Sequence, residues 1–509
     1  MIHGDRMDIP IFMATQHPDS ALRYFSAREE VDEAIRDVLP RNAGGFGCDE
    51  KMIDYEGKLT PFLQPVWILK KIKELEVHRI VPGNDFLLTV RCSTFSKESP
   101  ERHIISLLSA IMANVMSVKE FNTCVVKYIV HPMSLNVREL IGVQRRVLKL
   151  MEFAREELGL ASDEQVSIIP LVEDSCVMVR IDELLESYVT MAKRALGVYL
   201  DHIRVFLGKS DAALAYGHVT SAIAVKMALF KLWELADEMG MYIFPIIGSG
   251  TLPFRGHLSP SNIDYFTNTY KGYFTLTLQT SFRYDYTREE VLSAMNLIRI
   301  RRGRRPAEIE CSRDALMKIL RTFTSTYLET ILKMSGIILK IADNIPARRE
   351  RVEREVYGRE LSQAVMFTRN KKLLDLYSVS KTIFPRAIRF TASLYTLGIP
   401  PTLIGLGRGL KSLTSSEREE LFTIYPMLER DLKYDSKFTV LDVAKKYIPN
   451  FIMHDIMEDI EFLKSYFNLE FTCNEEYRNT LMAIYEEISK GKNASNHIVK
   501  AAVMRKGLG

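Results

Sequence analysis

The sequence predicts an α/β fold in which a parallel TIM-type (β/α)8 barrel is joined to a large additional block of helices. Three observations carry this prediction. Short β-rich runs recur in the first half, helix-periodic segments follow several of them, and strand signals almost vanish after Thr280. We expect the barrel strands, the loops of the site and an N-terminal segment within residues 1–285. Residues 286–509 should form a mostly helical block packed on the barrel, as part of one continuous unit.

The predicted strands are rich in β-branched and aromatic residues and are largely apolar, as strands buried on both faces should be. They are Phe86–Arg91, Cys124–Val130, Val166–Val172, Ile203–Leu207, Tyr242–Ile247 and Tyr273–Thr280. Successive strand ends lie about 30 to 42 residues apart, which suits a strand with its crossover helix. This spacing favours parallel strands closed into a barrel.

Helices are expected wherever apolar residues recur three and four positions apart. In the barrel half these segments are His103–Phe121, Gln144–Leu158 and Thr220–Met239. In the second half they are Arg288–Ile300, Ala307–Ile345, Arg354–Asp375, Ser380–Thr396, Ser415–Leu432 and Asp455–Phe467. The second half is therefore predicted to be mostly helical.

Composition and charge exclude several classes of protein. With 47% apolar and 26% charged residues, the 509-residue chain is not disordered. Its net charge of +4 is too small to predict binding to nucleic acid or to an anionic membrane. Residues Met1–Asp8 lack the apolar stretch of a signal peptide, and Pro400 and Pro401 interrupt the longest uncharged run, Phe390–Gly407. Six cysteines without a C-x-x-C pair fit a reducing cytoplasm.

Charged and polar residues follow the predicted strands, where a parallel barrel collects its reactive side chains. They are Arg91, His131, Glu173, Asp174, Lys209, Ser210, Asp211, Gly248, Ser249, Gly250, Arg255, Gln279 and Arg283. Carboxylates from different strands can share a hard divalent ion such as Mg²⁺, and arginines pair with phosphate or carboxylate oxygens. A helix cap or a surface ion pair explains any single residue equally well, so the prediction rests on their combination.

The turn from Gly248 to Gly256 follows an apolar strand and contains three glycines. Glycines there would let backbone N–H groups approach an anion closely. The turn matches neither the dinucleotide fingerprint nor a P-loop. An ordinary turn between a strand and a helix is an equally good interpretation.

Three further features have plainer interpretations. The run from Cys48 to Lys58 holds four carboxylates within eight residues; it could offer metal ligands, but a solvated or salt-bridged helix turn is favoured. His17, before a proline, is most simply a turn residue. The basic run Arg299–Arg305 is typical of a solvated turn, because no aromatic residues interleave it as in a nucleic-acid patch.

Taken in order, the motifs resemble one family. They are Thr15-Gln-His17-Pro-Asp19, Cys48-Asp-Glu50 followed by Asp54-Tyr-Glu-Gly-Lys58, and Gly248-Ser-Gly250 followed by Pro253-Phe-Arg-Gly256. With them the sequence resembles archaeal-type phosphoenolpyruvate carboxylase, effectively over the whole chain from His17 to Gly509. The length also suits this shorter branch of the carboxylases.

The resemblance implies a lyase that carboxylates phosphoenolpyruvate with bicarbonate to give oxaloacetate and inorganic phosphate, and so supplies four-carbon acids. The implied route passes through carboxyphosphate and a metal-stabilised enolate, with Mg²⁺ or Mn²⁺ as cofactor. The implied fold is the barrel of the phosphoenolpyruvate/pyruvate superfamily. The family also implies a cytoplasmic, allosteric homotetramer, with no nucleic-acid or membrane partner.

Roles for single residues follow from the same resemblance. His17 matches a histidine that acts on carboxyphosphate, and Arg255 matches the second arginine of a glycine-rich loop; both would be catalytic. Glu173 and Asp211 match metal ligands. The C-terminal residue, Gly509, would lie near the site.

Substrate binding is carried over to a second set of residues. Arg91 and Arg359 match arginines that hold the substrate. The glycine loop lacks the histidine and first arginine of the longer branch, and Leu214 stands where that branch has a lysine. The roles of these missing residues would be taken by the remaining substrate-binding candidates, or the mechanism would differ in detail. These candidates are Lys209, Arg283 and the backbone of Gly248, Ser249 and Gly250.

Two alternatives stay open at this point. Another metal-dependent barrel enzyme acting on a phosphoenolpyruvate or pyruvate enolate, a lyase or a phosphotransferase, would share the metal ligands and arginines without needing bicarbonate. A helical scaffold or RNA-binding protein would use Arg299–Arg305, although the near-neutral charge counts against it.

Overall fold

Eight parallel strands close into a barrel, each pairing with the next along the chain and β8 pairing with β1. The computed structural model describes residues 9–16, 26–75, 80–309, 311–346, 351–353 and 357–509. The strands are β1 (Phe12–Ala14), β2 (Glu50–Asp54), β3 (Leu87–Arg91), β4 (Tyr128–His131), β5 (Ser167–Val172), β6 (His202–Gly208), β7 (Tyr242–Gly248) and β8 (Thr275–Leu278). The predicted barrel is confirmed, and the six predicted strands correspond to β3 to β8.

The sequence did not predict strands β1 and β2, and β2 corrects one of the interpretations made from it. Residues Glu50–Asp54, interpreted as part of a solvated or salt-bridged helix turn, instead form the buried strand β2, although the expected salt bridges are present. Glu50 pairs with an arginine inside the barrel, whereas Lys51 pairs with Asp37 on the outer side. The charges that suggested exposure are thus neutralised inside the protein.

The barrel is filled by apolar side chains rather than being a channel. Its interior cluster consists of Met13, Met52, Leu87, Tyr128, Val130, Ile169, Leu171, Phe206 and Ile246. The opposite face of each strand contributes to a larger core shared with the surrounding helices. Burial on both faces explains why most of these strands are apolar along their length.

Helices surround the barrel, and those predicted between residues 103 and 300 are confirmed; three of them shift by at most three residues at an end, whereas the one predicted from Gln144 begins at Val137. The helices around the barrel are α1 (Glu29–Val38), α2 (Gln64–Glu74), α3 (Pro100–Phe121), α4 (Val137–Glu157), α5 (Ser175–Met178), α6 (Ile181–Leu196), α7 (Lys209–Tyr216), α8 (His218–Met239), α9 (Ile263–Thr269), α10 (Thr280–Tyr284) and α11 (Arg288–Arg301).

Side-chain caps set where several of these helices begin. The Ser99 side chain accepts a hydrogen bond from the Arg102 N–H at the start of α3, and Thr287 forms a capping box with Glu290 on α11. Among the described helices, α3 alone is long and apolar enough to cross a membrane by length and composition; here it packs between α2 and α4.

After α11 the described chain contains helices and isolated bridges but no further barrel strand. The helices are α12 (Arg313–Lys333), α13 (Ser335–Ala342), α15 (Ser362–Thr368), α16 (Lys371–Ser380), α17 (Ala387–Thr396), α18 (Leu406–Ser412), α19 (Ser415–Ile424), α20 (Leu428–Asp435), α21 (Leu441–Tyr447), α22 (Asn450–Phe467), α23 (Glu475–Ser489) and α24 (Ser495–Met504). Short 3₁₀ turns are η1 (Arg41–Ala43), η3 (Pro253–Arg255), η4 (Pro260–Asn262), η5 (Pro401–Leu403) and η6 (Ser436–Phe438).

Three predicted helices of this block are divided. The segment Ala307–Ile345 forms α12 and α13, and the segment Ser415–Leu432 forms α19 and most of α20. Within the predicted helix Arg354–Asp375, Arg359 instead forms an antiparallel bridge with Phe384, and Arg369, with φ of 57°, separates α15 from α16. The bridge directs this stretch toward the barrel, which a periodicity argument alone does not reveal.

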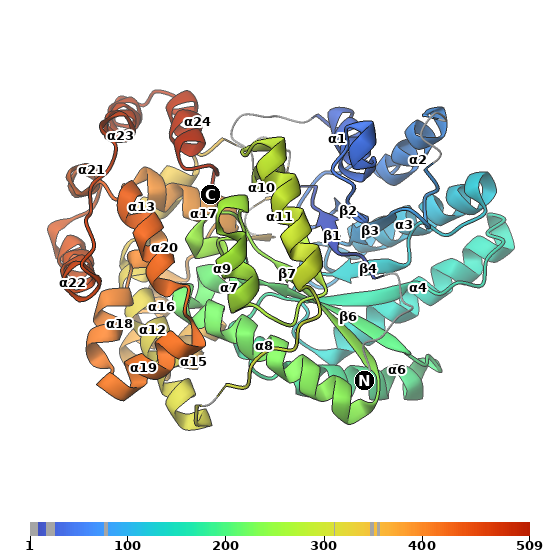
Figure 1. The fold of residues 1–509 in the computed structure, drawn as a ribbon, viewed down its shortest axis with the longest axis horizontal. Helices are drawn as coiled ribbons and strands as arrows, with labels where there is room; N and C mark the ends of the chain where they lie inside the picture. Colours follow the sequence, from blue (N-terminus) through green and yellow to red (C-terminus); the bar gives the residue numbers. More distant parts are fainter. Residues whose placement is uncertain (1–8, 17–25, 76–79, 310, 347–350, 354–356) are drawn as a thin grey trace.

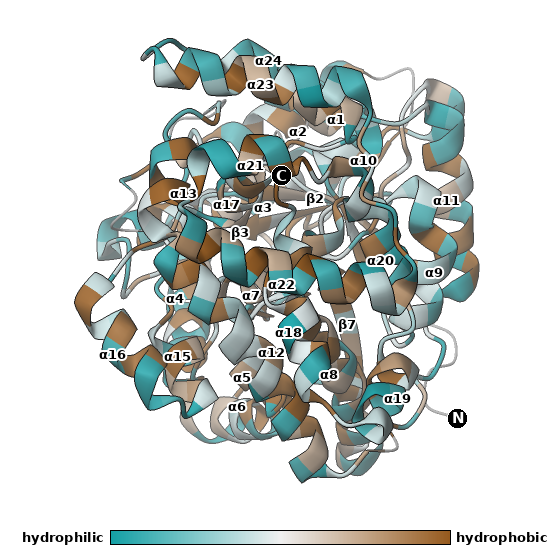
Figure 2. Cartoon of the chain, turned by 90° about the vertical axis from the view of Figure 1, so that its left-hand side faces the viewer, coloured by the Kyte–Doolittle hydropathy of each residue, from teal (hydrophilic) through white to brown (hydrophobic). Residues whose placement is uncertain are grey.

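The helical block is joined to the carboxyl ends of the barrel strands by a second core. This core unites Leu214 and Tyr216 on α7, and Phe254 of η3, with residues of α12 and α17. Figure 1 shows the block gathered at one side of the barrel, with the C-terminus reaching back near α17. Figure 2, facing the block, shows hydrophilic and hydrophobic residues alternating along its helices, as expected for helices with one buried side.

Candidate active site

A pocket lies at the carboxyl ends of the strands, between the barrel and the helical block. Its charged lining side chains are Asp54, Glu56, Arg91, Glu173, Asp211, Arg255, Arg351, Arg386 and Arg389. Six of these come from the barrel half and three arginines come from the block. This is the end of a parallel barrel at which active sites form.

Glu173 and Asp211, the two predicted metal ligands, lie together in this pocket. Glu173 follows β5, and Asp211 lies in the first turn of α7, directly after β6. Both carboxylates contact the same two guanidinium groups. Arg359 places Nη2 2.5 Å from Glu173 Oε2 and Nε 3.3 Å from Asp211 Oδ1, and Arg386 Nη2 lies 2.7 Å from Asp211 Oδ2.

The backbone is shaped to admit Glu173. A Cβ atom at Gly208, the last residue of β6, would lie 2.8 Å from Glu173 Cγ and 3.4 Å from its Oε1. A side chain at this position would push Glu173 out of the pocket. The absence of a side chain at Gly208 therefore lets the two carboxylates converge.

The two carboxylates differ in protonation because their surroundings differ. Burial, with the nearby charge of Asp211, raises the pKa of Glu173 to about 7 despite Arg359. Burial also works against the charge of Asp211, but Arg359 and Arg386 outweigh it and hold the pKa of Asp211 well below its usual value. A cation placed between the two carboxylates would favour the charged form of both.

Magnesium fits this set of donors. Mg²⁺ prefers hard oxygen ligands, binds through one or two carboxylates, and keeps several positions for water or substrate oxygens. Throughout the described residues there is no cluster of three or more His, Cys, Asp or Glu side chains arranged for a metal ion. Glu173 and Asp211 stay the predicted protein ligands, and such an ion would leave the other positions to water and substrate.

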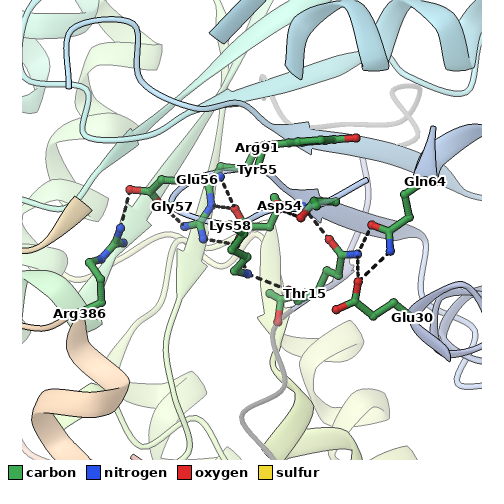
Figure 3. A network of polar contacts seen from close by, with 12 residues as sticks. Thr15, Glu30, Asp54, Tyr55, Glu56, Gly57, Lys58, Gln64, Arg91 and Arg386 are labelled. Carbon is green, nitrogen blue, oxygen red and sulfur yellow. Dashed lines mark hydrogen bonds and ion pairs between the residues drawn. The ribbon is translucent and has the colours of Figure 1, made fainter. Parts of the chain in front are cut away.

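Arg91 is held by two carboxylates at the end of β2, from Asp54, its last residue, and from Glu56 just beyond it (Figure 3). Its Nε and Nη2 donate to Asp54 Oδ1 and Oδ2 at 2.7 and 2.5 Å, and its Nη1 lies 3.1 Å from Glu56 Oε2. Burial disfavours a charged Asp54, yet Arg91 and Lys58 hold its pKa far below the usual range. The other oxygen of Glu56 lies 2.6 Å from Arg386 Nη1. Glu56 therefore connects an arginine of the barrel with an arginine of the block.

The same cluster fixes the chain just before His17. Lys58 forms an ion pair with Asp54 and donates to the carbonyl of Gln16 at 2.9 Å. The side chain of Gln16 accepts from the Asp54 N–H at 2.9 Å and donates to Glu30 Oε2 at 2.9 Å. His17 itself, the predicted catalytic histidine, lies outside the described residues. Its predicted role stays a prediction, although its immediate neighbour is fixed beside Asp54.

Arg255, the other predicted catalytic residue, lines the pocket and is held in a fixed orientation. Its Nε donates to Ser210 Oγ at 3.2 Å, and its Nη2 donates to Gln279 Oε1 at 2.9 Å. Its Nη1 donates to the backbone oxygen of Gly509, and Leu508 lines the pocket. The C-terminus thus meets Arg255 at the pocket, where the resemblance places it.

The glycines of the 248–256 turn are needed for close packing within the turn. The Gly250 N–H donates to the Arg255 carbonyl at 2.9 Å, and a Cβ at Gly250 would lie 2.9 Å from Arg255 Cβ. Gly256 has φ of 121°, and a Cβ there would lie 2.5 Å from Ser249 Oγ. Of the three residues expected to contact substrate through their backbone, Gly248 lines the pocket, whereas the N–H of Gly250 is engaged inside the turn.

Lys209 and Arg283 follow their strands as predicted but point away from the pocket. Lys209 Nζ donates to the Phe254 carbonyl at 2.8 Å and lies 3.2 Å from His218 Nδ1. Arg283 Nη2 donates to the carbonyl of Thr15 at 2.8 Å, and the guanidinium is paired with Glu33 and Asp37. The structure thus separates these two substrate-binding candidates from Arg91, Arg255 and the metal pair.

A buried network supports the turn from behind. Asp431 on α20 lies 3.0 Å from His218 Nε2 and 2.6 Å from His257 Nδ1. Because Lys209 contacts both His218 and the Phe254 carbonyl, the network connects the start of α7 with the end of the turn that carries Arg255. Burial lowers the pKa of His218 to about 4, so its ring is neutral at pH 7.

Sequence reasoning missed the functional position of Glu56 and of Arg386. Glu56 belongs to the carboxylate-rich run, which was interpreted as a solvated or salt-bridged helix turn rather than as part of the site. Arg386 directly precedes α17, an apolar helix in which Arg389 is the sole charged residue. Arginines at the start of a buried helix, with no acidic residue nearby in sequence, are a signal for a distant anionic partner.

Comparisons with known proteins agree with this geometry. A profile of the phosphoenolpyruvate carboxylase family matches residues 9–509. A phosphoenolpyruvate carboxylase of Methanosarcina barkeri is 34% identical over 484 residues, covering 92% of this chain and 90% of that protein. Phosphoenolpyruvate carboxylases of Methanopyrus kandleri and Pyrobaculum islandicum are 33% and 32% identical, covering 86% and 89% of this chain and 85% and 92% of theirs.

Proposed function

Because this chain belongs to the phosphoenolpyruvate carboxylase family and is an enzyme of that family, we propose that it joins phosphoenolpyruvate and bicarbonate in the described pocket to give oxaloacetate and inorganic phosphate. The observation that carries the proposal is the pairing of Glu173 and Asp211 among several pocket arginines. Such a site can neutralise a phosphate and a carboxylate at once.

The proposed reaction has two stages. A bicarbonate oxygen attacks phosphorus, the bond from phosphorus to the enol oxygen breaks, and the products are carboxyphosphate and the enolate of pyruvate. Carboxyphosphate then gives up its proton and splits into carbon dioxide and phosphate. The nucleophilic carbon of the enolate attacks carbon dioxide, and the new carbon–carbon bond completes oxaloacetate.

The residues of the chain would divide this work. Arg91 and Arg359 would hold the anionic groups of phosphoenolpyruvate, and Arg255, fixed by three hydrogen-bond acceptors, would neutralise charge as it develops. His17 would take the proton of carboxyphosphate, since an unperturbed histidine with a pKa of roughly 6.5 suits a general base at neutral pH. The buried walls would keep carbon dioxide beside the enolate.

Glu173 and Asp211 would hold the Mg²⁺ or Mn²⁺ that the family implies. When bound, the ion would supply a Lewis acid that polarises phosphate and stabilises negative charge on oxygen, which is worth several kcal/mol. Gly208 supports this role because its missing side chain lets Glu173 reach Asp211.

The test measures oxaloacetate formation, monitored as NADH oxidation by added malate dehydrogenase. Phosphoenolpyruvate, the divalent metal and bicarbonate are each left out in turn, and we expect each omission to abolish activity. Arg255→Ala and His17→Ala should each lower kcat by about 10²- to 10³-fold, whereas Arg305→Ala, at an exposed arginine that does not line the pocket, should not. Phosphate release without a bicarbonate requirement would contradict the proposal and favour another enzyme acting on the same enolate.

Assembly and location are further parts of the proposal. A cytoplasmic homotetramer under allosteric control is what the family implies. Large apolar side chains exposed on α15, α16 and α22, namely Met366, Val379 and Phe451, are of the kind that subunit contacts cover. Light scattering of the purified protein should give a mass four times that of the chain, and a monomer at micromolar concentration would contradict the tetramer.

A further inference from the structure

We propose that Arg386 competes with the divalent metal ion for Asp211, and that the metal, on binding, releases this arginine to the anionic substrate. Metal and substrate would then bind cooperatively, with Arg386 as the residue that couples them. The inference rests on the proposed function, because it uses the same two carboxylates and the same substrate class.

Arg386 occupies both oxygens of Asp211. Its Nε donates to Oδ1 at 3.1 Å and its Nη2 donates to Oδ2 at 2.7 Å, which is a bidentate pair of the strong kind. The same Nη2 lies 3.5 Å from Glu173 Oε1. A metal ion shared by these two carboxylates would need oxygen lone pairs that the guanidinium now uses.

A third contact determines where Arg386 goes when it leaves Asp211. Its Nη1 lies 2.6 Å from Glu56 Oε1, and the other oxygen of Glu56 lies 3.1 Å from Arg91 Nη1. Figure 3 shows Glu56 between the two arginines. Glu56 can therefore keep the released guanidinium beside Arg91, which is itself a candidate for holding the substrate.

The anchor of Arg386 is rigid while its side chain is accessible. It directly precedes α17, whose Phe390 and Leu394 are fully buried in the core of the block. The Arg386 side chain is 16% exposed and faces the pocket. The exchange thus needs only rotations of one side chain and no movement of the helix.

Charge explains why metal and substrate should help each other. At the metal pair, Glu173 and Asp211 carry −2 when ionised, and Arg359 and Arg386 carry +2, so these four groups sum to zero. A divalent cation changes the sum from zero to +2. The cation alone is repelled by two nearby guanidinium groups, and an anionic substrate removes that repulsion.

Arg389 provides a matched control on the same helix. It also lines the pocket and lies three residues after Arg386. Its hydrogen bond among the described residues is to the carbonyl of Ile345, at 3.5 Å, rather than to a carboxylate. Replacing either arginine with glutamine removes one positive charge from the pocket, but only Arg386→Gln removes the bidentate partner of Asp211 and leaves it, within the part of the chain that the structure describes, with the single contact to Arg359.

The experiment measures binding of Mn²⁺, followed by the electron paramagnetic resonance signal of the free ion, without substrate and then with phosphoglycolate as an unreactive analogue. In wild-type enzyme the analogue should tighten Mn²⁺ binding, within the about 5- to 150-fold range typical of coupled sites. Arg386→Gln should bind Mn²⁺ alone about tenfold more tightly than wild type and should lose most of the coupling. Arg389→Gln should stay within about threefold of wild type in both respects, because screened charge alone has a small effect.

Two further variants separate the possible failures. Arg386→Lys keeps the charge but lacks the planar fork, so its Mn²⁺ affinity should fall between those of wild type and Arg386→Gln. Asp211→Asn should lose Mn²⁺ binding; if it does not, the metal assignment of the proposed function fails, whatever Arg386 does. If Asp211→Asn loses Mn²⁺ but Arg386→Gln binds it no more tightly than wild type, or couples it to the analogue as strongly, the inference about Arg386 is overturned.

Discussion

Arginine–carboxylate clusters lie at both ends of the barrel, and they differ in how completely they are closed. At the amino-terminal end, Arg204 of β6 donates to both oxygens of Glu50 at 2.8 and 2.7 Å and to Thr275 Oγ1 at 3.1 Å. Its guanidinium carbon lies 4.7 Å from the centre of the Tyr128 ring. Neither side chain of the pair is exposed.

At the carboxyl-terminal end, arginines and carboxylates each have more than one partner, and their side chains remain partly exposed. Each of Glu173 and Asp211 faces two arginines, each of these arginines faces two or more carboxylates, and their side chains are 8–16% exposed. The pairs line a pocket instead of filling the barrel. The difference teaches that a closed pair holds the fold, whereas a shared, accessible cluster can exchange partners with a ligand.

Breaking the closed pair should have the largest effect. Glu50→Gln leaves the charge of Arg204 buried without a counter-charge, and the free energy of unfolding should fall by about 3–5 kcal/mol. Urea unfolding followed by circular dichroism measures this change. The rate of carboxylation per folded molecule should stay at the wild-type value.

The control for this prediction removes both charges. Glu50→Met combined with Arg204→Met should recover most of the lost stability, because two apolar side chains can replace a buried ion pair. A loss below about 1 kcal/mol for Glu50→Gln, the range of an exposed pair, would show that the closed pair is no more stabilising than a surface one.

Removing an arginine from the cluster at the carboxyl-terminal end should lower the rate of the reaction more than it lowers stability. Arg359→Gln should lower kcat/KM by about 10²- to 10³-fold, because a preorganised positive charge beside the substrate is lost. Its free energy of unfolding should change less than that of Glu50→Gln, since water reaches the pocket. Steady-state kinetics measure the effect, with Arg369→Gln, an exposed arginine of the same segment, as control. A wild-type kcat/KM would remove Arg359 from the site.

His131 tests whether position at the carboxyl end is sufficient for a role in catalysis. It ends β4, but its ring is buried against Ser134 Oγ at 3.1 Å and does not line the described pocket. Burial, helped by His103 and Arg146, lowers the pKa of His131 from 6.5 to about 3. Below pH 6.5, His131 therefore binds a proton in the unfolded chain but stays neutral in the folded protein.

The sign of the pH dependence follows directly. The neutral His131 ring gives the folded protein a stabilisation that is complete above pH 6.5. This stabilisation is lost as the pH falls from 6.5 toward 3, because the unfolded chain becomes protonated first. His131→Asn should reduce the slope of unfolding free energy against pH in this window by about 1 kcal/mol per pH unit, while carboxylation at neutral pH is kept. Urea unfolding at several pH values measures the slope. An unchanged slope together with lost activity would place His131 in the site.

A surface pair should have the smallest effect. Arg305 Nη1 lies 2.8 Å from Asp237 Oδ2, and the two side chains are 58% and 42% exposed. Arg305→Ala should change the free energy of unfolding by about 0–1 kcal/mol, because water and salt screen the pair. Thermal unfolding at low and high salt checks this value. A loss comparable to that of Glu50→Gln would contradict the link between closure and stability.

Local patterns predicted the elements that depend on local chemistry. Strands β3 to β8 and helices such as α8 and α11 were found because their apolar spacing matches one regular structure. β1 has only three residues, and β2 carries charges whose partners come from distant segments, so neither shows a strand pattern. The stretch around Arg359 leaves the predicted helix to form a bridge with Phe384, a contact 25 residues away that no local pattern encodes.

The sequence predicted which residues lie at the strand ends better than it predicted which way their side chains point. Strand ends correctly placed Glu173, Asp211, Arg91 and Arg255 around one pocket. The same rule placed Arg283 at the rim, but Glu33 and Asp37 on α1 turn its side chain away. Arg386 was missed because its partners are more than 170 residues away in sequence, and only the packing of α17 on the barrel brings them together.

The most direct test compares one carboxylate from each end of the barrel. The quantity measured is the initial rate of bicarbonate-dependent oxaloacetate formation per folded molecule, for Glu173→Gln beside Glu50→Gln. The account predicts that Glu173→Gln loses about 10²- to 10³-fold in rate, whereas Glu50→Gln keeps the wild-type rate at a temperature where it is folded. A wild-type rate for Glu173→Gln, or an equal loss for Glu50→Gln, would contradict the division between an end that holds the fold and an end that carries the chemistry.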